Sequence, residues 1–517
     1  MMTVLWLGVT TCCLACCLIL ANRVSTPKEV ATALLGKRRL WIGDVVSILM
    51  VALFYPLLLL TINRFWSATL LGFALIVLLW AGNRLKVMIL SETLVFSDVF
   101  LAGHALRYPR LYFGYAPTWI WPCLIGLLGL GVWGMSHETA FSSFSGLERT
   151  LIVASLISMV LCIGWILSKP FKFIKGCLVR WPLSFDVQTD VWAYTPLGAG
   201  LLHLLWHGQY RKALRDKFSR PKEAETDCPK NGPMPKHLLL IQAESYVPLH
   251  QWVDRRSVTP TLDGLMKTVN TGSLELAWRG AYTMRTEFAV LTGIAPRQLE
   301  TYGFDPYRLA AMVPMQSLAW TKKREGYKAV VCHPNDGHFF NRFQVMKNLG
   351  FDEFIDLKRL ITEWPELKEE RSHCGRYIND QALLEWASNY LKNATEPTFL
   401  FVITMEAHGP WDESKFPGAQ NMAEEKRYEV HLGHLDLGVE TLLKAQEEGL
   451  DASILIYGDH PPGLRILREK DDILSSQTTW VAWNTKNPKV SKKQYEPLGP
   501  EKLTKVWQRI LSSFRGN

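Results

Sequence analysis

The chain lacks the cysteine pattern of a disulfide-rich or zinc-ribbon protein. Most of its 10 cysteines lie in or beside long apolar runs, and the more polar remainder holds only Cys228, Cys332 and Cys374. An odd number of thiols without CxxC spacing argues against both a disulfide framework and a zinc ribbon there. A single Cys332–Cys374 bridge stays open as an alternative.

The chain also lacks a basic stripe interleaved with aromatic residues, the usual signature of a nucleic-acid-binding protein. Its net charge is +9, and much of the excess flanks the apolar runs. Positive charge beside apolar segments suits contact with anionic lipid. We therefore expect a membrane partner and no nucleic-acid partner.

Long apolar runs are concentrated in the first third of the chain, which is 48% hydrophobic overall. The run at 4–21 has neither the charged start nor the small-residue cleavage site of a signal peptide, so we interpret it as a retained helix. Segment 90–112 is amphipathic and aromatic, which is typical of a membrane-surface segment. The other runs are near the roughly 20 residues that span a bilayer: 45–62, 68–82, 117–135 and 150–167. We predict a polytopic α-helical membrane domain of about five helices over residues 1–170.

The rest of the chain reads as a connector followed by an α/β domain. The connector, 171–235, ends in a polar, proline-containing tract that marks a domain boundary. From Lys236 onward, helical stretches alternate with five apolar runs typical of strands: HLLLIQA, YKAVVCH, TFLFVITM, SILIYGD and TWVAWN. This alternation predicts a mostly parallel sheet covered by helices on both faces. We expect residues 236–517 to form this second domain.

Polar side chains follow two of these strands directly. Glu244 comes after HLLLIQA, and Asp459 with His460 comes after SILIYG. Ligands of an open α/β sheet lie beyond the carboxyl ends of its strands, so we expect these side chains to converge. Alone, Glu244 could equally cap the next turn. With the hydroxyl of Thr283 or Thr286 nearby, the set predicts a divalent-metal site with an activated alcohol.

A second group of polar residues follows other strands. His333 and Arg342 flank a turn-rich loop, and the forked guanidinium donors of arginine match phosphate oxygens. The alternative for Arg342 is a surface ion pair with Asp352. His408 follows the strand TFLFVITM and is the third histidine at the same predicted edge. We interpret the remaining histidines of this domain as structural, including His250, His373, His431 and His434.

Five short motifs identify a family when they are taken together and in order. They are AES at 243–245, TEFAVLTG at 286–293, CHPNDGHFFNRF at 332–343, EAH at 406–408 and GDH at 458–460. From Lys236 to about Asn487 the chain resembles the lipoteichoic-acid synthase family of the alkaline phosphatase and sulfatase superfamily. The resemblance implies an alkaline-phosphatase-like, or sulfatase-like, α/β fold. A sulfatase proper would carry Cys or Ser followed by x-Pro-x-Arg, a pattern that does not follow Thr283.

The resemblance also implies roles for individual residues. Thr283 would be the nucleophile, and His408 would act with it in catalysis. One divalent ion, Mn²⁺ ahead of Mg²⁺ or Zn²⁺, would be held by Glu244, Thr283, Asp459 and His460. Substrate would be held by His333, Arg342 and His408, together with two positions that depart from Gram-positive members, Asn335 in place of aspartate and Phe340 in place of tryptophan.

The function implied by the resemblance is membrane-bound transfer of a glycerophosphate head group. The donor would be phosphatidylglycerol, the acceptor a glycan or glycolipid, and the intermediate a phosphothreonine. Phosphoethanolamine transfer is the alternative within the superfamily. A non-catalytic membrane scaffold with a sulfatase-like fold is the alternative from a different class.

The expected location is a multi-pass protein of the cytoplasmic membrane with its catalytic domain on the extracytoplasmic, or periplasmic, side. The distribution of basic residues predicts the opposite orientation. Five spans would leave thirteen basic residues on the side of the catalytic domain and two on the other, and the positive-inside rule would then place that domain in the cytoplasm. We favour the family's placement, because a miscounted span reverses the charge argument but leaves the motifs unchanged.

Overall fold

The chain divides into two compact units, Met1–Leu214 and Arg215–Asn517, and each is described by itself. The boundary falls inside the predicted connector, 171–235, and the domain limits themselves stay a prediction. Scattered positions between 150 and 171 are described, and the computed structural model otherwise describes residues 2–27, 38–99, 120–140, 172–219, 235–252, 256–278, 280–411, 421–468, 476–484 and 493–513.

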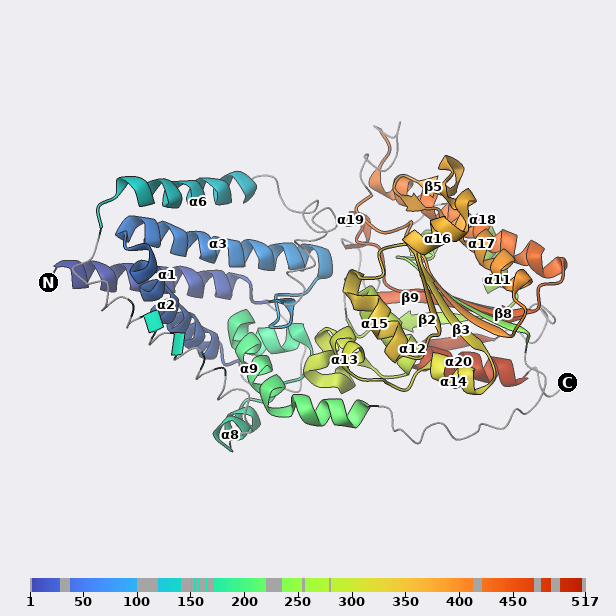
Figure 1. Ribbon diagram of the computed structural model, residues 1–517, viewed down its shortest axis with the longest axis horizontal. Helices are drawn as coiled ribbons and strands as arrows, with labels where there is room; N and C mark the ends of the chain where they lie inside the picture. Colours follow the sequence, from blue (N-terminus) through green and yellow to red (C-terminus); the bar gives the residue numbers. More distant parts are fainter. Residues whose placement is uncertain are drawn as a thin grey trace. The chain divides into compact units, whose positions relative to one another are not determined.

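The first unit is helical (Figure 1). Its helices are α1 (Met2–Val24), α2 (Trp41–Ile62), α3 (Phe65–Leu90), α6 (Ile120–His137), α8 (Lys172–Arg180) and α9 (Val187–Phe218), which continues into the second unit. Among the described residues, two segments are long and apolar enough to cross a bilayer, Trp41–Ile62 and Phe65–Met88.

The other predicted spans have a weaker counterpart in the described residues. Those at 4–21 and 117–135 fall on α1 and α6, whose apolar parts are shorter. The run at 150–167 and most of the amphipathic segment 90–112 lie outside the described residues. The polytopic count of about five therefore stays a prediction.

Helix α9 contains buried polar contacts. It is kinked at Thr195, which has φ 66° and precedes Pro196. The buried Asp190 carboxylate accepts a hydrogen bond from His203 Nε2 at 2.7 Å. A Cβ added at Gly43 would lie 1.7 Å from Thr195 Oγ1, so α2 and α9 approach closely there. Segment 195–208, too interrupted by glycine and histidine to predict as a span, is thus part of a kinked helix.

The second unit is built on one eight-stranded sheet with the order β10-β2-β9-β8-β1-β7-β3-β4. β9 is antiparallel to both of its neighbours and the other pairings are parallel, which confirms the predicted mostly parallel sheet. The strands are β1 (His237–Ala243), β2 (Asn270–Glu275), β3 (Lys328–His333), β4 (Glu353–Asp356), β7 (Thr398–Ile403), β8 (Ala452–Gly458), β9 (Gln477–Asn484) and β10 (Gln494–Leu498).

The degree of burial of each strand explains whether the sequence predicted that strand. The five apolar runs are β1, β3, β7, β8 and β9, and every residue of β1, β7 and β8 is buried. A strand covered on both faces reads as a continuous apolar run. β2, β4 and β10 contain polar residues and include partly exposed positions, so they carried no such signal.

Helices cover both faces of the sheet (Figure 1). One face packs against α11 (Pro260–Met266), α17 (Asp380–Asn393) and α18 (Glu424–Glu447) in a single apolar core. The other is covered by α12 (Thr283–Thr292), α14 (Leu318–Arg324) and α20 (Pro500–Ser513). There Trp507 Nε1 donates to Ser453 Oγ at 3.2 Å.

Shorter elements connect these layers. They are α10 (Leu249–Trp252), η2 (Pro296–Phe304), α13 (Pro306–Met312), η3 (Phe339–Asn341), α15 (Arg342–Asn348), α16 (Leu357–Glu363), η4 (Pro365–Lys368), η5 (Glu370–Ser372), the hairpin of β5 (His373–Cys374) with β6 (Tyr377–Ile378), and α19 (Arg465–Arg468).

Candidate functional site

Three of the predicted metal ligands meet beyond the carboxyl ends of two adjacent strands. β1 and β8 are parallel and pair Ala243 with Gly458, so Glu244 and Asp459 leave the sheet side by side. Glu244, Asp459 and His460 are all buried, and one ligand atom from each lies within 4.8 Å of the others. The sheet therefore builds the cluster that the strand ends indicated.

Ser245 holds this cluster together. Its backbone has φ 55°, and its amide donates to Asp459 Oδ1 at 2.8 Å. Its hydroxyl donates to Glu244 Oε1 at 2.9 Å. Tyr428, on α18, donates its hydroxyl to the Ser245 carbonyl at 2.7 Å. Ser245 thus fixes two carboxylates in position, and its hydroxyl is engaged.

The two threonines of the central stretch lie in different surroundings. Thr283 is the first residue of α12 and is partly exposed. Thr286, one turn later, is buried and donates its hydroxyl to the Asp459 carbonyl at 2.7 Å. The amino-terminal end of a helix favours an anionic group such as phosphate. Of the two hydroxyls, Thr283 is therefore the better placed to react.

The charged groups of the cluster shift one another's pKa values. Burial and the negative charge of Glu244 raise the pKa of Asp459 to about 7, against a lowering contribution from the Thr283 side chain. Burial alone would lower the pKa of His460, but Asp459 and Glu244 raise it to about 9. Burial alone would raise the pKa of Glu244, but His460 lowers it to about 2. Without a cation, a proton on His460 compensates the carboxylates.

The donor set fits a divalent cation. Asp459 Oδ2 is buried without a hydrogen-bond partner, which is costly for a carboxylate oxygen. His460 Nδ1 lies 3.0 Å from the Pro461 carbonyl, which leaves Nε2 facing Glu244 at 3.3 Å and Asp459 at 3.4 Å. Such outer hydrogen bonds orient metal-binding histidines. Carboxylate oxygens with one imidazole suit Mn²⁺, Mg²⁺ or Zn²⁺.

Two further histidines border the cluster. His333 ends β3, is buried, and has Nδ1 3.4 Å from the Ile403 carbonyl. Burial lowers its pKa well below the ordinary value, which favours the neutral imidazole. His408 follows β7, is partly exposed, and has Nδ1 2.7 Å from the Gly409 carbonyl. His408 lowers the pKa values of both Glu244 and His333 electrostatically, so it lies close to this cluster.

Arg342 lies in a buried setting that the sequence did not indicate. Its Nη2 atom is 3.1 Å from Glu287 Oε2, and both side chains are almost fully buried. The alternative of a surface pair with Asp352 is wrong, because Asp352 pairs with Lys323. Arg342 Nε is buried without a hydrogen-bond partner, so one guanidinium donor is left for an anionic ligand.

Glu287 is the residue that sequence reasoning missed. It follows Thr283 by four positions, so both lie on the same face of α12. Its carboxylate also accepts hydrogen bonds from the Tyr307 hydroxyl and from Gln242 Nε2. The sequence signal that could have identified Glu287 is its position four residues after the predicted nucleophile, Thr283.

The two positions that depart from the Gram-positive pattern, Asn335 and Phe340, lie in the segment that follows β3. Asn335 makes a local turn, in which its Oδ1 accepts from the Asp336 amide at 2.9 Å. Phe340 has φ 54°, a conformation that is strained for a bulky residue. Its ring centre lies 5.6 Å from Arg342 Cζ. Phe340 therefore packs on the guanidinium predicted to bind phosphate.

The proposed Cys332–Cys374 disulfide is wrong. Both residues are buried, Cys332 in β3 and Cys374 in β5, and they are not bonded to each other. Cys332 is part of the core between the sheet and its helices. Its small side chain fits the closely packed strand, which is a sufficient reason for a cysteine there.

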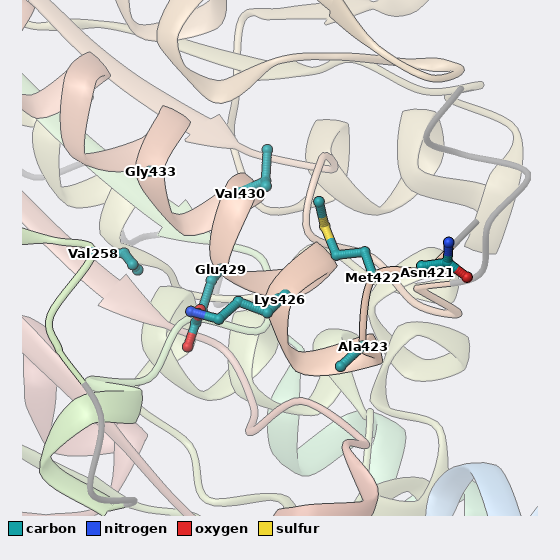
Figure 2. Close-up of a pocket in the computed structure, with 8 residues that line it drawn as sticks. All are labelled: Val258, Asn421, Met422, Ala423, Lys426, Glu429, Val430 and Gly433. Atoms are coloured by element: carbon teal, nitrogen blue, oxygen red, sulfur yellow. The ribbon is translucent and has the colours of Figure 1, made fainter. Parts of the chain in front are cut away.

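A large cavity of the second unit lies away from this cluster. Its volume is about 890 Å³, and it runs along the first turns of α18 (Figure 2). Its lining consists of Val258, Asn421, Met422, Ala423, Lys426, Glu429, Val430 and Gly433. Figure 2 shows Lys426 beside Glu429, whose charged atoms are 2.7 Å apart. No predicted site residue lines this cavity.

Comparison with known proteins defines the class. A family model described as "Sulfatase" matches residues 236–496, and the chain belongs to this family. It is 25% identical over 401 residues to "Capsular polysaccharide biosynthesis protein RkpI" of Rhizobium meliloti, covering 74% of this chain and 71% of the relative. It is 27% identical over 164 residues to a lipoteichoic acid synthase of Staphylococcus saprophyticus, covering 30% of this chain and 24% of the relative.

A solved structure resembles the second unit. The phosphoglycerol transferase GacH of Streptococcus pyogenes, in complex with sn-glycerol-1-phosphate, matches with a TM-score of 0.40 at 20% identity. The match covers 58% of this chain and 79% of the GacH chain. The matches to the Sulfatase family model and to a lipoteichoic acid synthase agree with the family that the motif order indicated.

Proposed function

We propose that the chain is a membrane-bound phosphotransferase that moves a glycerophosphate head group from phosphatidylglycerol to a hydroxyl of a glycan or glycolipid. The observation that carries the proposal is the position of Thr283, at the start of α12 beside Glu244, Asp459 and His460. The sulfatase family and the lipoteichoic acid synthase relative support phosphoryl chemistry. The capsular polysaccharide relative supports a glycan acceptor.

Glu244, Thr283, Asp459 and His460 would hold one divalent cation, with Mn²⁺ favoured. When bound, such a cation lowers the pKa of an alcohol and stabilises negative charge on phosphoryl oxygens. Ser245 keeps both carboxylates in position for this role. The amino-terminal end of α12 adds a favourable dipole for phosphate.

In the first step, Thr283 Oγ would form a bond to phosphorus and release its proton to solvent, while the bond from phosphorus to the diacylglycerol oxygen breaks. The partly exposed His408 would give a proton to that oxygen. In the second step, the acceptor hydroxyl would bond to phosphorus and pass its proton to His408, while the bond from phosphorus to Thr283 Oγ breaks and Thr283 takes up a proton from solvent. Arg342 Nε, His333 and Phe340 would contact the head group.

The test is peptide mass spectrometry of the full-length protein in detergent after incubation with phosphatidylglycerol. We expect a glycerophosphate adduct on Thr283, absent from Thr283→Ala and still present in Thr286→Val. Thr286→Val is the matched control, because it removes a hydroxyl one turn away that already donates to the Asp459 carbonyl. An adduct on Thr286 or Ser245 would overturn the nucleophile assignment.

Competition between two lipid donors decides the head group. Asn335 has no charge to attract an ammonium group, although its amide can hydrogen bond a glycerol hydroxyl. We therefore expect phosphatidylglycerol to be consumed before phosphatidylethanolamine. The reverse order would favour phosphoethanolamine transfer. No adduct from either lipid, with a folded and metal-loaded protein, would favour the non-catalytic scaffold.

A further inference from the structure

A second group of side chains that could hold a metal ion lies in the second unit. Cys374, Glu406 and His434 each offer one ligand atom, and these atoms lie within 4.8 Å of one another. They come from three places: the hairpin strand β5, the turn after β7, and α18. None of them is one of the ligands of the first cluster, Glu244, Asp459 and His460.

Glu406 is the centre of this group. Its side chain is fully buried, and its Oε1 atom lies 2.9 Å from His431 Nδ1 and 2.5 Å from His434 Nδ1. Its Oε2 atom accepts the backbone amide of Asp380 at 2.6 Å. Two imidazoles and an amide around one carboxylate make an ordinary buried hydrogen-bonded network, which is the simpler interpretation.

Two observations go beyond such a network. First, the hairpin brings the thiol of Cys374 to the same point, although Glu406 needs no further donor. Second, Asp380 Oδ1 is buried next to this carboxylate without a hydrogen-bond partner, and the side chain is only 1% exposed. A thiol and a second carboxylate beside a glutamate that already has its hydrogen bonds bring sulfur and oxygen donors to one point, a set that suits a metal ion.

We propose that Cys374, Glu406 and His434 form a second divalent-metal site, specific for a zinc-class ion. Zn²⁺ accepts sulfur, nitrogen and oxygen ligands together, whereas Mn²⁺ and Mg²⁺ favour oxygen. A thiolate and a carboxylate neutralise the ion's charge. Binding would release the thiol proton to solvent.

The surroundings allow an ion to reach this site. The His434 side chain is 27% exposed, whereas Glu406 is fully buried. Three protein ligands with one position open to solvent is a common zinc arrangement. His431 would stay hydrogen bonded to Glu406 and orient it, as outer groups do around metal ligands.

A metal ion at the second site would also help to position His408, the candidate catalytic residue next to the first site. Glu406 and His408 belong to the same turn after β7. Tyr377 pairs with Cys374 across the hairpin, and its ring centre lies 6.5 Å from that of His408. An ion bound to Cys374 and Glu406 would therefore restrict the movement of the hairpin that carries Tyr377 and of the turn that carries His408.

Metal content and cobalt spectroscopy of the full-length, metal-stripped protein test the proposal. After reloading with Zn²⁺, we expect Cys374→Ala to bind one equivalent less than wild type per chain. After loading with Co²⁺, we expect a thiolate-to-cobalt charge-transfer band in wild type that Cys374→Ala loses. Cys332→Ala is the matched control, because it removes another buried thiol and should keep both signals.

Two more variants make the outcome decisive. Glu244→Gln should lose the first ion but keep the thiolate band, which separates the two sites. His434→Gln changes a partly exposed side chain, so it tests the site even if Cys374→Ala fails to fold. Unchanged zinc content and an unchanged band in both Cys374→Ala and His434→Gln would leave only the hydrogen-bonded network. That result would not affect the proposed role of Thr283.

Discussion

Arg342 and Glu287 form a buried ion pair in which guanidinium Nη2 lies 3.1 Å from carboxylate Oε2. The pair joins α15 to α12, the helix that begins at Thr283. The charge of Glu287 also keeps the pKa of Arg342 above its ordinary value in spite of burial. The residue predicted to bind phosphate is thus held in place by the helix that carries the predicted nucleophile.

Breaking this pair should destabilise the second unit. Glu287→Ala leaves a buried guanidinium without its counter-ion, and we expect the free energy of unfolding to fall by about 3–5 kcal/mol. Lys323→Ala is the control, because its pair with Asp352 is about one-third exposed on both sides and should contribute about 1 kcal/mol or less. Denaturant titration of both variants provides the comparison. Equal losses would mean that the Arg342–Glu287 pair has no special role.

Gly458→Ala should disturb the first metal cluster. A Cβ at Gly458 would lie 2.0 Å from the Tyr246 carbonyl oxygen, so the turn containing Glu244 and Ser245 must move away from Asp459. We expect a loss of about 1–3 kcal/mol in stability, as for other overpacked sites, and weaker binding of the first ion. Isothermal titration with Mn²⁺ measures the second effect. Gly264→Ala, where a Cβ meets nothing within 4 Å, should leave metal binding unchanged.

His237 should make stability depend on pH. Burial, together with the charge of Lys236, lowers its pKa from 6.5 to about 4. The unfolded chain therefore binds more protons between these values, so this contribution is present above pH 6.5 and is lost as pH falls toward 4. We expect His237→Leu to show a shallower loss of unfolding free energy than wild type over that range. Parallel slopes for the two proteins would contradict the assignment.

Reporter fusions test the orientation of the catalytic unit. We propose that it lies outside the cytoplasmic membrane, against the basic charge that flanks the apolar runs. A reporter active only outside the cytoplasm, fused after Asn517, should be active. Activity of a cytoplasmic reporter at the same position, with silence from the first, would mean that the charge rule holds.

Local pattern alone was enough to predict the central strands and the strand ends at which the candidate metal ligands lie. β1, β7 and β8 are covered on both faces, and burial requires continuous apolar runs that end abruptly at Glu244, at the turn before His408 and at Asp459. The edge strand β4 and the strands β2 and β10 left no such pattern, because part of each is polar and partly exposed. Motif order identified the family because it depends on residue identity alone.

Local spacing alone does not distinguish Thr283 from Thr286, and the choice of Thr283 came from the family resemblance. Only the tertiary structure shows that the Thr286 hydroxyl is buried and donates to the carbonyl of Asp459, 173 positions away in the chain. The same holds for Arg342, whose partner is Glu287 and not Asp352. The grouping of Cys374, Glu406 and His434 likewise depends on how a hairpin, a strand end and a helix pack. Spacing along the chain determines which residues share a strand or helix, but contacts between distant segments arise only when the sheet and its helices bury their apolar faces together.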